Sequence, residues 1–152
     1  MGACGVGKTN IISRFYSGSF VENSPSTVGI DYCTKTVKIN KEDVSLTLWD
    51  TSGQELFFSL VRNFLIYFDF IVFVYAVDNK ESFKNVETYF QFYQEKKLNI
   101  GTLLVGNKID VPVEEKVVTT EEGKEYARKN GMEFFEVSAK AGTGLKEDFF
   151  NP

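Results

Sequence analysis

The sequence lacks the residue patterns that mark several classes of protein. Its two cysteines, Cys4 and Cys33, have a spacing that indicates neither a metal site nor a disulfide framework. No cluster of basic residues is present and the formal net charge is −4, so the chain has no electrostatic footprint for nucleic acid. We therefore expect a reducing compartment and a small anionic ligand that is bound locally.

Long apolar runs are also missing. The most apolar stretch, Phe64 to Val77, is interrupted by Asp69 and is too short to span a bilayer. No basic region followed by an apolar stretch marks a signal peptide at the start of the sequence. We expect no transmembrane helix and a cytoplasmic protein.

What the sequence contains is typical of one globular domain. Its 152 residues are 43% hydrophobic and 25% charged, without repeats or low-complexity segments. Hydrophobic periodicity predicts helices and strands in alternation after an antiparallel hairpin. The predicted helices are 8–17, 82–94 and one from the Thr119/Glu122 capping box to 130; the predicted strands are 32–48 as a hairpin, 70–76, 102–105 and 133–137. This order implies an open, mostly parallel α/β sheet with ligand sites at the carboxyl ends of its strands.

The stretch "GACGVGKT" at residues 2–9 fits the phosphate-binding pattern GxxxxGK[ST]. Its glycines let backbone N–H groups surround a phosphate, and the following helix adds its dipole. Lys8 would bridge the β- and γ-phosphates of a nucleotide, and the Thr9 hydroxyl would ligate Mg²⁺. The alternative for this stretch alone is a glycine-rich turn before a helix.

Three further stretches follow predicted strands. In "LWDTSGQE", Asp50 is placed to hold Mg²⁺, Gly53 to approach a terminal phosphate and Gln54 to orient a water, although a plain turn explains this stretch in isolation. In "VGNKID", the Asp110 carboxylate can accept two hydrogen bonds from guanine but not from adenine. In "VSAK", residues 137–140 could present backbone amides to the base oxygen. Four such stretches in this order favour a GTP site.

With these motifs the chain resembles the small GTPases of the Ras superfamily, and among them most closely the Rab family. "STVGIDY" resembles the Rab segment with the switch threonine, here Thr27, and Phe20 falls where the family stacks an aromatic ring on guanine. "WDTSGQE" differs from the family's WDTAGQE only at Ser52. The resemblance covers nearly the whole chain and implies a P-loop small-GTPase fold.

The resemblance also implies roles for individual residues. Mg²⁺ would be held by Thr9, Thr27 and Asp50, and hydrolysis of GTP to GDP would depend on Gln54, Thr27 and Lys8. The residues assigned to the nucleotide are Gly5, Val6, Gly7, Lys8, Thr9, Asn10, Phe20, Thr27, Gly53, Asn107, Lys108, Asp110, Ser138, Ala139 and Lys140.

The implied function is a vesicle-trafficking switch that hydrolyses GTP slowly. No arginine is evident in cis, so an activating protein would supply one, and exchange factors and effectors would bind the two switch regions. Two alternatives stay open: a relative that binds nucleotide and partners without turnover, and an ATP-using P-loop protein, which Asp110 and the Thr27 segment disfavour.

Some features depart from the Rab pattern. Cys4 stands in the loop position nearest the γ-phosphate, where its sulfur could slow hydrolysis. The alternatives for Cys4 are a redox-active thiol and a buried small residue without chemistry. Phe57, Phe58, Phe64 and Leu65 replace polar residues, and we favour an exposed partner-binding patch over extra core.

The ends of the sequence depart further. We expect a single G domain over 1–152 that is truncated at both ends, lacking the family's first strand and most of its last helix. The first strand would lie between the hairpin and strand 70–76, so its absence would leave unpaired backbone groups on both neighbours and weaken nucleotide binding. Endomembrane association would require a prenylated tail, which this sequence does not contain.

Overall fold

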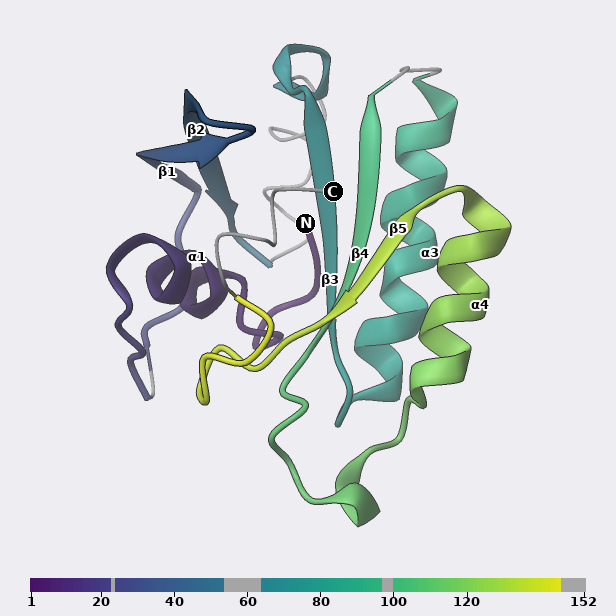
Figure 1. The fold of residues 1–152 in the computed structure, drawn as a ribbon. Helices are drawn as coiled ribbons and strands as arrows, with labels where there is room; N and C mark the ends of the chain where they lie inside the picture. Colours follow the sequence, from purple (N-terminus) through teal and green to yellow (C-terminus); the bar gives the residue numbers. More distant parts are fainter. Residues whose placement is uncertain (23, 54–63, 97–99, 146–152) are drawn as a thin grey trace.

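A computed structural model describes residues 1–22, 24–53, 64–96 and 100–145. Within these ranges, helices and strands alternate after an antiparallel hairpin, as Figure 1 shows. The strands are β1 (Ile30–Ile39), β2 (Glu42–Thr51), β3 (Phe70–Ala76), β4 (Gly101–Asn107) and β5 (Glu133–Glu136). The helices are α1 (Lys8–Ser17), α3 (Lys80–Glu95) and α4 (Thr120–Asn130), with short 3₁₀ helices at Leu65–Tyr67 and Val113–Glu115.

Local signals in the sequence set the ends of the helices. α1 ends at Gly18, whose φ of 71° is the left-handed conformation that stops a helix. At the start of α4, the Thr119 hydroxyl accepts a hydrogen bond from the Glu122 amide at 3.1 Å, and the Glu122 carboxylate accepts one from the Thr119 amide at 2.9 Å. α3 begins two residues before the predicted position because the Asn79 side chain caps it by accepting a hydrogen bond from the Ser82 amide.

The hairpin turns through two residues. Asn40 and Lys41 both have positive φ, 51° and 72°, as a type I′ turn requires. This turn sets the register, which pairs Val37 with Val44 and Cys33 with Leu48. The predicted apolar positions of the two strands therefore lie on one face.

The described strands form two separate sheets. β3, β4 and β5 are parallel neighbours in that order, whereas β1 pairs only with β2. Beside β3, the Met1 amino group donates to the Val72 carbonyl at 2.5 Å and the Met1 carbonyl accepts from the Val74 amide at 2.7 Å. The expectation that β3 would have unpaired groups on this side is therefore wrong at Val72 and Val74.

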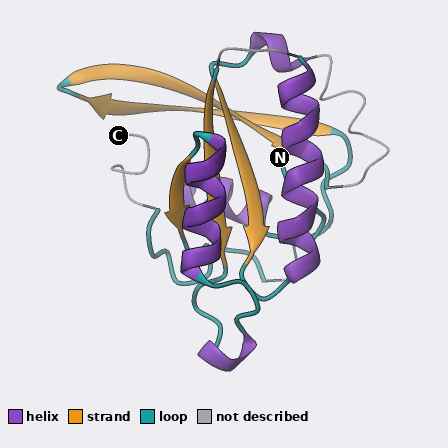
Figure 2. Ribbon diagram, turned by 90° about the vertical axis from the view of Figure 1, so that its right-hand side faces the viewer, coloured by secondary structure: helices purple, strands orange, loops and turns teal. Residues whose placement is uncertain are grey.

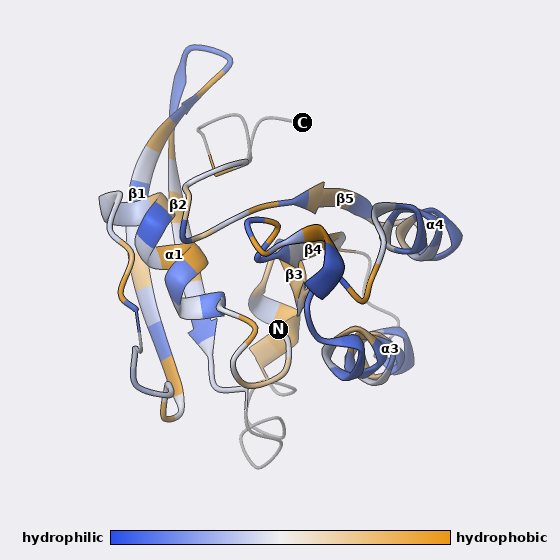
Figure 3. Ribbon diagram, turned by 90° about the horizontal axis from the view of Figure 1, so that it is seen from below, coloured by the Kyte–Doolittle hydropathy of each residue, from blue (hydrophilic) through white to orange (hydrophobic). Residues whose placement is uncertain are grey.

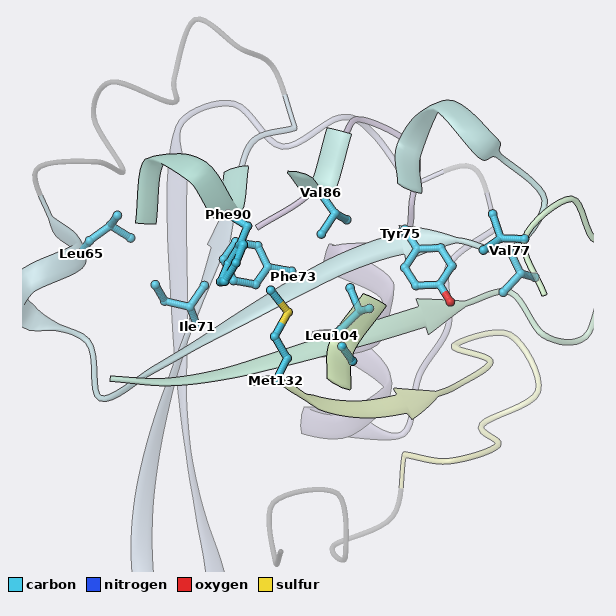
Figure 4. Close-up of a cluster of buried hydrophobic side chains, with 11 residues drawn as sticks. Leu65, Ile71, Phe73, Tyr75, Val77, Val86, Phe90, Leu104 and Met132 are labelled. Atoms are coloured by element: carbon cyan, nitrogen blue, oxygen red, sulfur yellow. The ribbon is translucent and has the colours of Figure 1, made fainter. Parts of the chain in front are cut away.

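The parallel sheet has a hydrophobic core on each face. α3 and α4 cover one face and α1 lies on the opposite side (Figures 1 and 2). Figure 4 shows the larger cluster, in which Phe73, Tyr75 and Leu104 are fully buried against α3 and α4. The second cluster joins Val6 and Ile11 to side chains from the other face of β3 and β4. In Figure 3, apolar residues lie along β3 and β4, and polar ones on the outer turns of α3 and α4.

The aromatic segment that precedes β3 belongs partly to this core. Leu65 is only 1% exposed and packs in the larger cluster, so the prediction of a partner-binding patch is wrong for this residue. In this short segment nearly every residue is apolar, so the sequence does not reveal which side chains face the core. The 3₁₀ turn at Leu65–Tyr67 directs Leu65 inward. Phe64 is 45% exposed, while Phe57 and Phe58 lie outside the described residues. Among the described helices, none has the length and apolar character needed to cross a membrane.

Candidate nucleotide-binding site

The glycine-rich loop runs from the side of β3 into α1. Gly7 has φ 93°, and a Cβ at this position would lie 2.4 Å from the Asn107 side-chain nitrogen, so only glycine fits here. The Lys8 ammonium donates to the carbonyls of Gly2 at 2.7 Å and Ala3 at 2.9 Å. Burial lowers the pKa of Lys8, and the nearby Asp50 carboxylate opposes this shift. A half-buried cation within a glycine loop is suited to binding an anion.

The segment after β2 touches this loop. A Cβ at Gly53 would lie 2.4 Å from the Cys4 amide nitrogen, so glycine permits the close approach of the two backbones. Cys4 is exposed, with its sulfur 3.8 Å from the Ser26 hydroxyl, and the interpretation of Cys4 as a buried residue is wrong. Gln54 lies outside the described residues.

The three predicted metal ligands meet beside Lys8. The hydroxyls of Thr9 and Thr27 donate to the same Asp50 oxygen, Oδ2, at 2.6 and 3.0 Å, and the two hydroxyls are 2.8 Å apart. The other carboxylate oxygen, Oδ1, is buried and has no hydrogen-bond partner among the described residues. A buried carboxylate oxygen without a partner is costly, which points to a ligand at this position.

Asn107, at the end of β4, connects the loop to the "VSAK" stretch. Its side-chain nitrogen donates to the Val6 carbonyl at 2.8 Å, and its side-chain oxygen accepts from the Ala139 amide at 3.1 Å. Asn107 is 2% exposed, so both hydrogen bonds are shielded from water. The Ser138 hydroxyl donates to Asp110 at 2.5 Å and so orients the carboxylate. The predicted residues from three segments therefore lie together.

α1 contacts the remaining predicted residues. The Asn10 side chain accepts from the Val21 amide at 3.3 Å and donates to the Ser24 hydroxyl at 3.4 Å. Phe20 is half-buried, and its ring lies 5.9 Å from the Arg14 guanidinium carbon. Lys140 is exposed and forms an ion pair with Glu22 at 3.3 Å.

Two residues at the site were not found by sequence reasoning. Arg14 hydrogen-bonds the carbonyls of Ala139 and Lys140, and Asp78 forms an ion pair of 3.2 Å with Lys108. Lys108 itself has a left-handed backbone, with φ 69°. Neither Arg14 nor Asp78 belongs to a motif, and the only signal for Asp78 is its place just beyond the end of β3.

A glycine-rich loop, a threonine and aspartate cluster and polar residues at the ends of β4 and β5 lie along one edge of a parallel sheet. This is the architecture of a P-loop nucleotide-binding protein of the small-GTPase class.

Comparison with known proteins identifies the family. The sequence pattern of the Ras family matches residues 1–151. The chain is 36% identical to the Ras-related protein Rab-11B of Dictyostelium discoideum, over 99% of this chain and 69% of the relative. It is 37% identical to the Ras-related protein Rab-1 of Theileria parva, over 98% and 68% of the two chains, and 34% identical to RAB1BV of Beta vulgaris, over 99% and 71%.

The chain therefore belongs to the Ras family, with Rab proteins among its relatives. The predicted small-GTPase fold is confirmed. As a Rab-like member, the protein is a GTP-binding switch that hydrolyses GTP and acts in vesicle trafficking, and it works with regulators and effectors.

Proposed function

We propose that residues 1–152 form one G domain that binds GTP and GDP with Mg²⁺ at the site described above. The observation that carries the proposal is the buried Asp50 carboxylate, which meets Thr9 and Thr27 while its oxygen Oδ1 has no partner among the described residues. Gly5, Val6, Gly7, Lys8 and Thr9 would hold the phosphates, and Asn10 and Gly53 would border them.

The residues present fit Mg²⁺. This ion takes hard oxygen ligands and is usually held by one or two protein carboxylates together with water and substrate phosphate. Thr9, Thr27 and Asp50 offer two hydroxyls and one carboxylate. No cluster of three or more His, Cys, Asp or Glu side chains exists in the described part of the chain, which fits an ion held jointly with a phosphate. Bound there, Mg²⁺ would neutralise phosphate charge.

The base site recognises guanine through Asp110. Its carboxylate accepts hydrogen bonds from the ring N–H and the exocyclic amino group, while adenine would leave it unpaired. The Lys140 amide would donate to the exocyclic oxygen of the base, next to the Ala139 amide, which is bonded to Asn107. Phe20 and the Lys108 side chain cover the base, and Ser138 keeps Asp110 in place.

Hydrolysis proceeds by in-line attack of water on the γ-phosphate. Gln54 and the Thr27 backbone orient this water, and Lys8 stabilises the charge that develops on the phosphate oxygens. Of the arginines among the described residues, Arg14 binds backbone carbonyls and Arg128 lies on α4, so neither serves the γ-phosphate. Intrinsic turnover is then slow, and an activating protein would accelerate it by about 10³- to 10⁵-fold. The two switch segments that follow Phe20 and Asp50 bind regulators and effectors. As in a Rab cycle, the protein moves between cytoplasm and endomembranes when it carries a prenylated tail.

Single-turnover hydrolysis of GTP by the purified protein tests the catalytic proposal. We expect slow, Mg²⁺-dependent release of phosphate from GTP and none above background from ATP. The Gln54→Leu variant should bind GTP normally and hydrolyse it at least about tenfold more slowly, because the water loses its orienting group. Equal rates in the two proteins would show that Gln54 does not have this role.

Asp110→Asn tests base recognition separately. The amide can donate a hydrogen bond where the carboxylate accepted one, so the variant should lose affinity for GTP and gain affinity for XTP, whose base has an oxygen in place of the amino group. The preference of GTP over XTP should reverse or fall by at least about 100-fold, as measured by competition for a fluorescent nucleotide. Parallel losses for both nucleotides would contradict a direct contact.

A further inference from the structure

The Arg14 side chain uses all three nitrogens of its guanidinium group on backbone carbonyls. Nε donates to Ala139 at 2.8 Å, Nη2 to Lys140 at 2.6 Å and Nη1 to Gly18 at 2.6 Å. The first two acceptors are more than 120 residues away in sequence. The planar guanidinium is thus fixed in the junction between α1 and the "VSAK" stretch.

The Arg14 side chain also lies close to Phe20, which is expected on the opposite side of the base site from residues 138–140. Its guanidinium carbon is 5.9 Å from the centre of the Phe20 ring, within the range of a cation–π contact. The Glu22–Lys140 ion pair, 3.3 Å long, spans the same two segments at the surface. Exposed ion pairs of this kind contribute little to stability, so the Arg14 guanidinium is the stronger link between the Phe20 segment and residues 138–140.

The geometry of the peptide bond gives the Ala139 contact a directional effect. In a planar trans peptide the carbonyl of Ala139 and the amide N–H of Lys140 point in opposite directions. Holding that carbonyl therefore fixes the direction of the Lys140 N–H, and a cationic donor on the carbonyl also polarises the N–H on the far side. Asn107 fixes the preceding peptide through the Ala139 amide.

We propose that Arg14 is a positioning residue for guanine recognition, which aims the Lys140 amide at the exocyclic oxygen of the base and holds Phe20 against its plane. This inference rests on the proposed function, because it requires guanine between Phe20 and residues 138–140. Lysine cannot replace Arg14, since a single ammonium cannot hold three carbonyls in a fork geometry.

The test compares GDP with 6-thio-GDP, in which sulfur, a weaker acceptor, replaces the exocyclic oxygen. The proteins are the wild type, Arg14→Met, Arg14→Lys and, as a matched control, Arg128→Met on the exposed side of α4. Arg14→Met should release GDP at least about tenfold faster, and its preference for GDP over 6-thio-GDP should fall at least about threefold, because the amide no longer points at the oxygen. Arg14→Lys should restore less than half of the lost preference, and Arg128→Met should match the wild type.

A purely structural role predicts a different result. If Arg14→Met weakens both nucleotides by the same factor, or Arg14→Lys restores the full preference, the positioning role is refuted. Should Arg14→Met not fold, the Arg14→Lys preference ratio decides the question alone. Failure of the wild type to prefer GDP over ADP would instead refute the guanine site itself, so the two failures are distinguishable.

Discussion

The Asn107→Ala substitution offers the sharpest test of how the site is held together. It removes one donor and one acceptor, and so leaves the Val6 carbonyl and the Ala139 amide without their partners at 2.8 and 3.1 Å. Val6 is 1% and Ala139 3% exposed, so water cannot replace the lost bonds. Each buried unsatisfied group costs about 1–3 kcal/mol, which gives a loss of roughly 2–6 kcal/mol in the free energy of unfolding for the two groups. That is a large part of the ~5–15 kcal/mol typical of a domain.

Urea denaturation of the nucleotide-free protein measures this loss without a contribution from ligand binding. The single tryptophan, Trp49, contacts Phe68 at 5.9 Å between ring centres and reports the transition by fluorescence. We expect the midpoint to fall by at least about 1 M. The control is Asn130→Ala, which removes one half-buried hydrogen bond at the end of α4. If Asn107→Ala lost no more stability than this control, the hydrogen-bonded link between loop and base site would be energetically unimportant.

Two further predictions concern stability. Lys35→Met removes the 2.6 Å hydrogen bond from the ammonium to the Phe15 carbonyl and its contact with the Phe15 ring, so it should cost about 1–2 kcal/mol in urea denaturation. Lys38→Met, which loses only an exposed ion pair, should cost less than about 0.5 kcal/mol; equal losses would contradict the reasoning. Hydrogen bonds from Lys80 and the helix start lower the pKa of Glu122, so its stabilisation is present above its ordinary value of 4.5 and is lost as pH falls through the lowered pKa. Glu122→Gln should lose less stability than the wild type between pH 7 and 3, and an identical loss would exclude this role.

The helices and central strands could be predicted because their signals are local. α1 and β3 have the predicted bounds, Lys8–Ser17 and Phe70–Ala76, since a motif with its closing glycine and a continuous apolar run define them. The hairpin strands extend beyond the prediction to Ile30 and Thr51, because pairing with the opposite strand continues past the apolar alternation. Backbone pairing of this kind depends on the partner and leaves no pattern in one strand.

The residues of the site also divide into those that the sequence reveals and those that it does not. Thr9 and Asp50 could be predicted from motifs at the ends of predicted elements, and Thr27 from the resemblance to Rab proteins; the structure brings the three side chains together. Arg14 could not be found, because it binds carbonyl groups, which every residue carries and no sequence distinguishes. For Leu65, the alternative of extra core was the correct one, and only packing against the parallel sheet decided it.

The hairpin has a mechanical property that follows from its attachment to α1. Lys35, which binds the end of α1, stands five residues from Ile30 at the site end and five from Asn40 at the turn. At about 3.4 Å per residue, each arm is about 17 Å long. Among the described residues, the hairpin is bonded to α1 both at this midpoint and at Asp50, and its two strands are not paired with the parallel sheet. The turn at Asn40 therefore projects about 17 Å beyond the Lys35 contact with α1, while the opposite arm ends beside Asp50 at the predicted metal site.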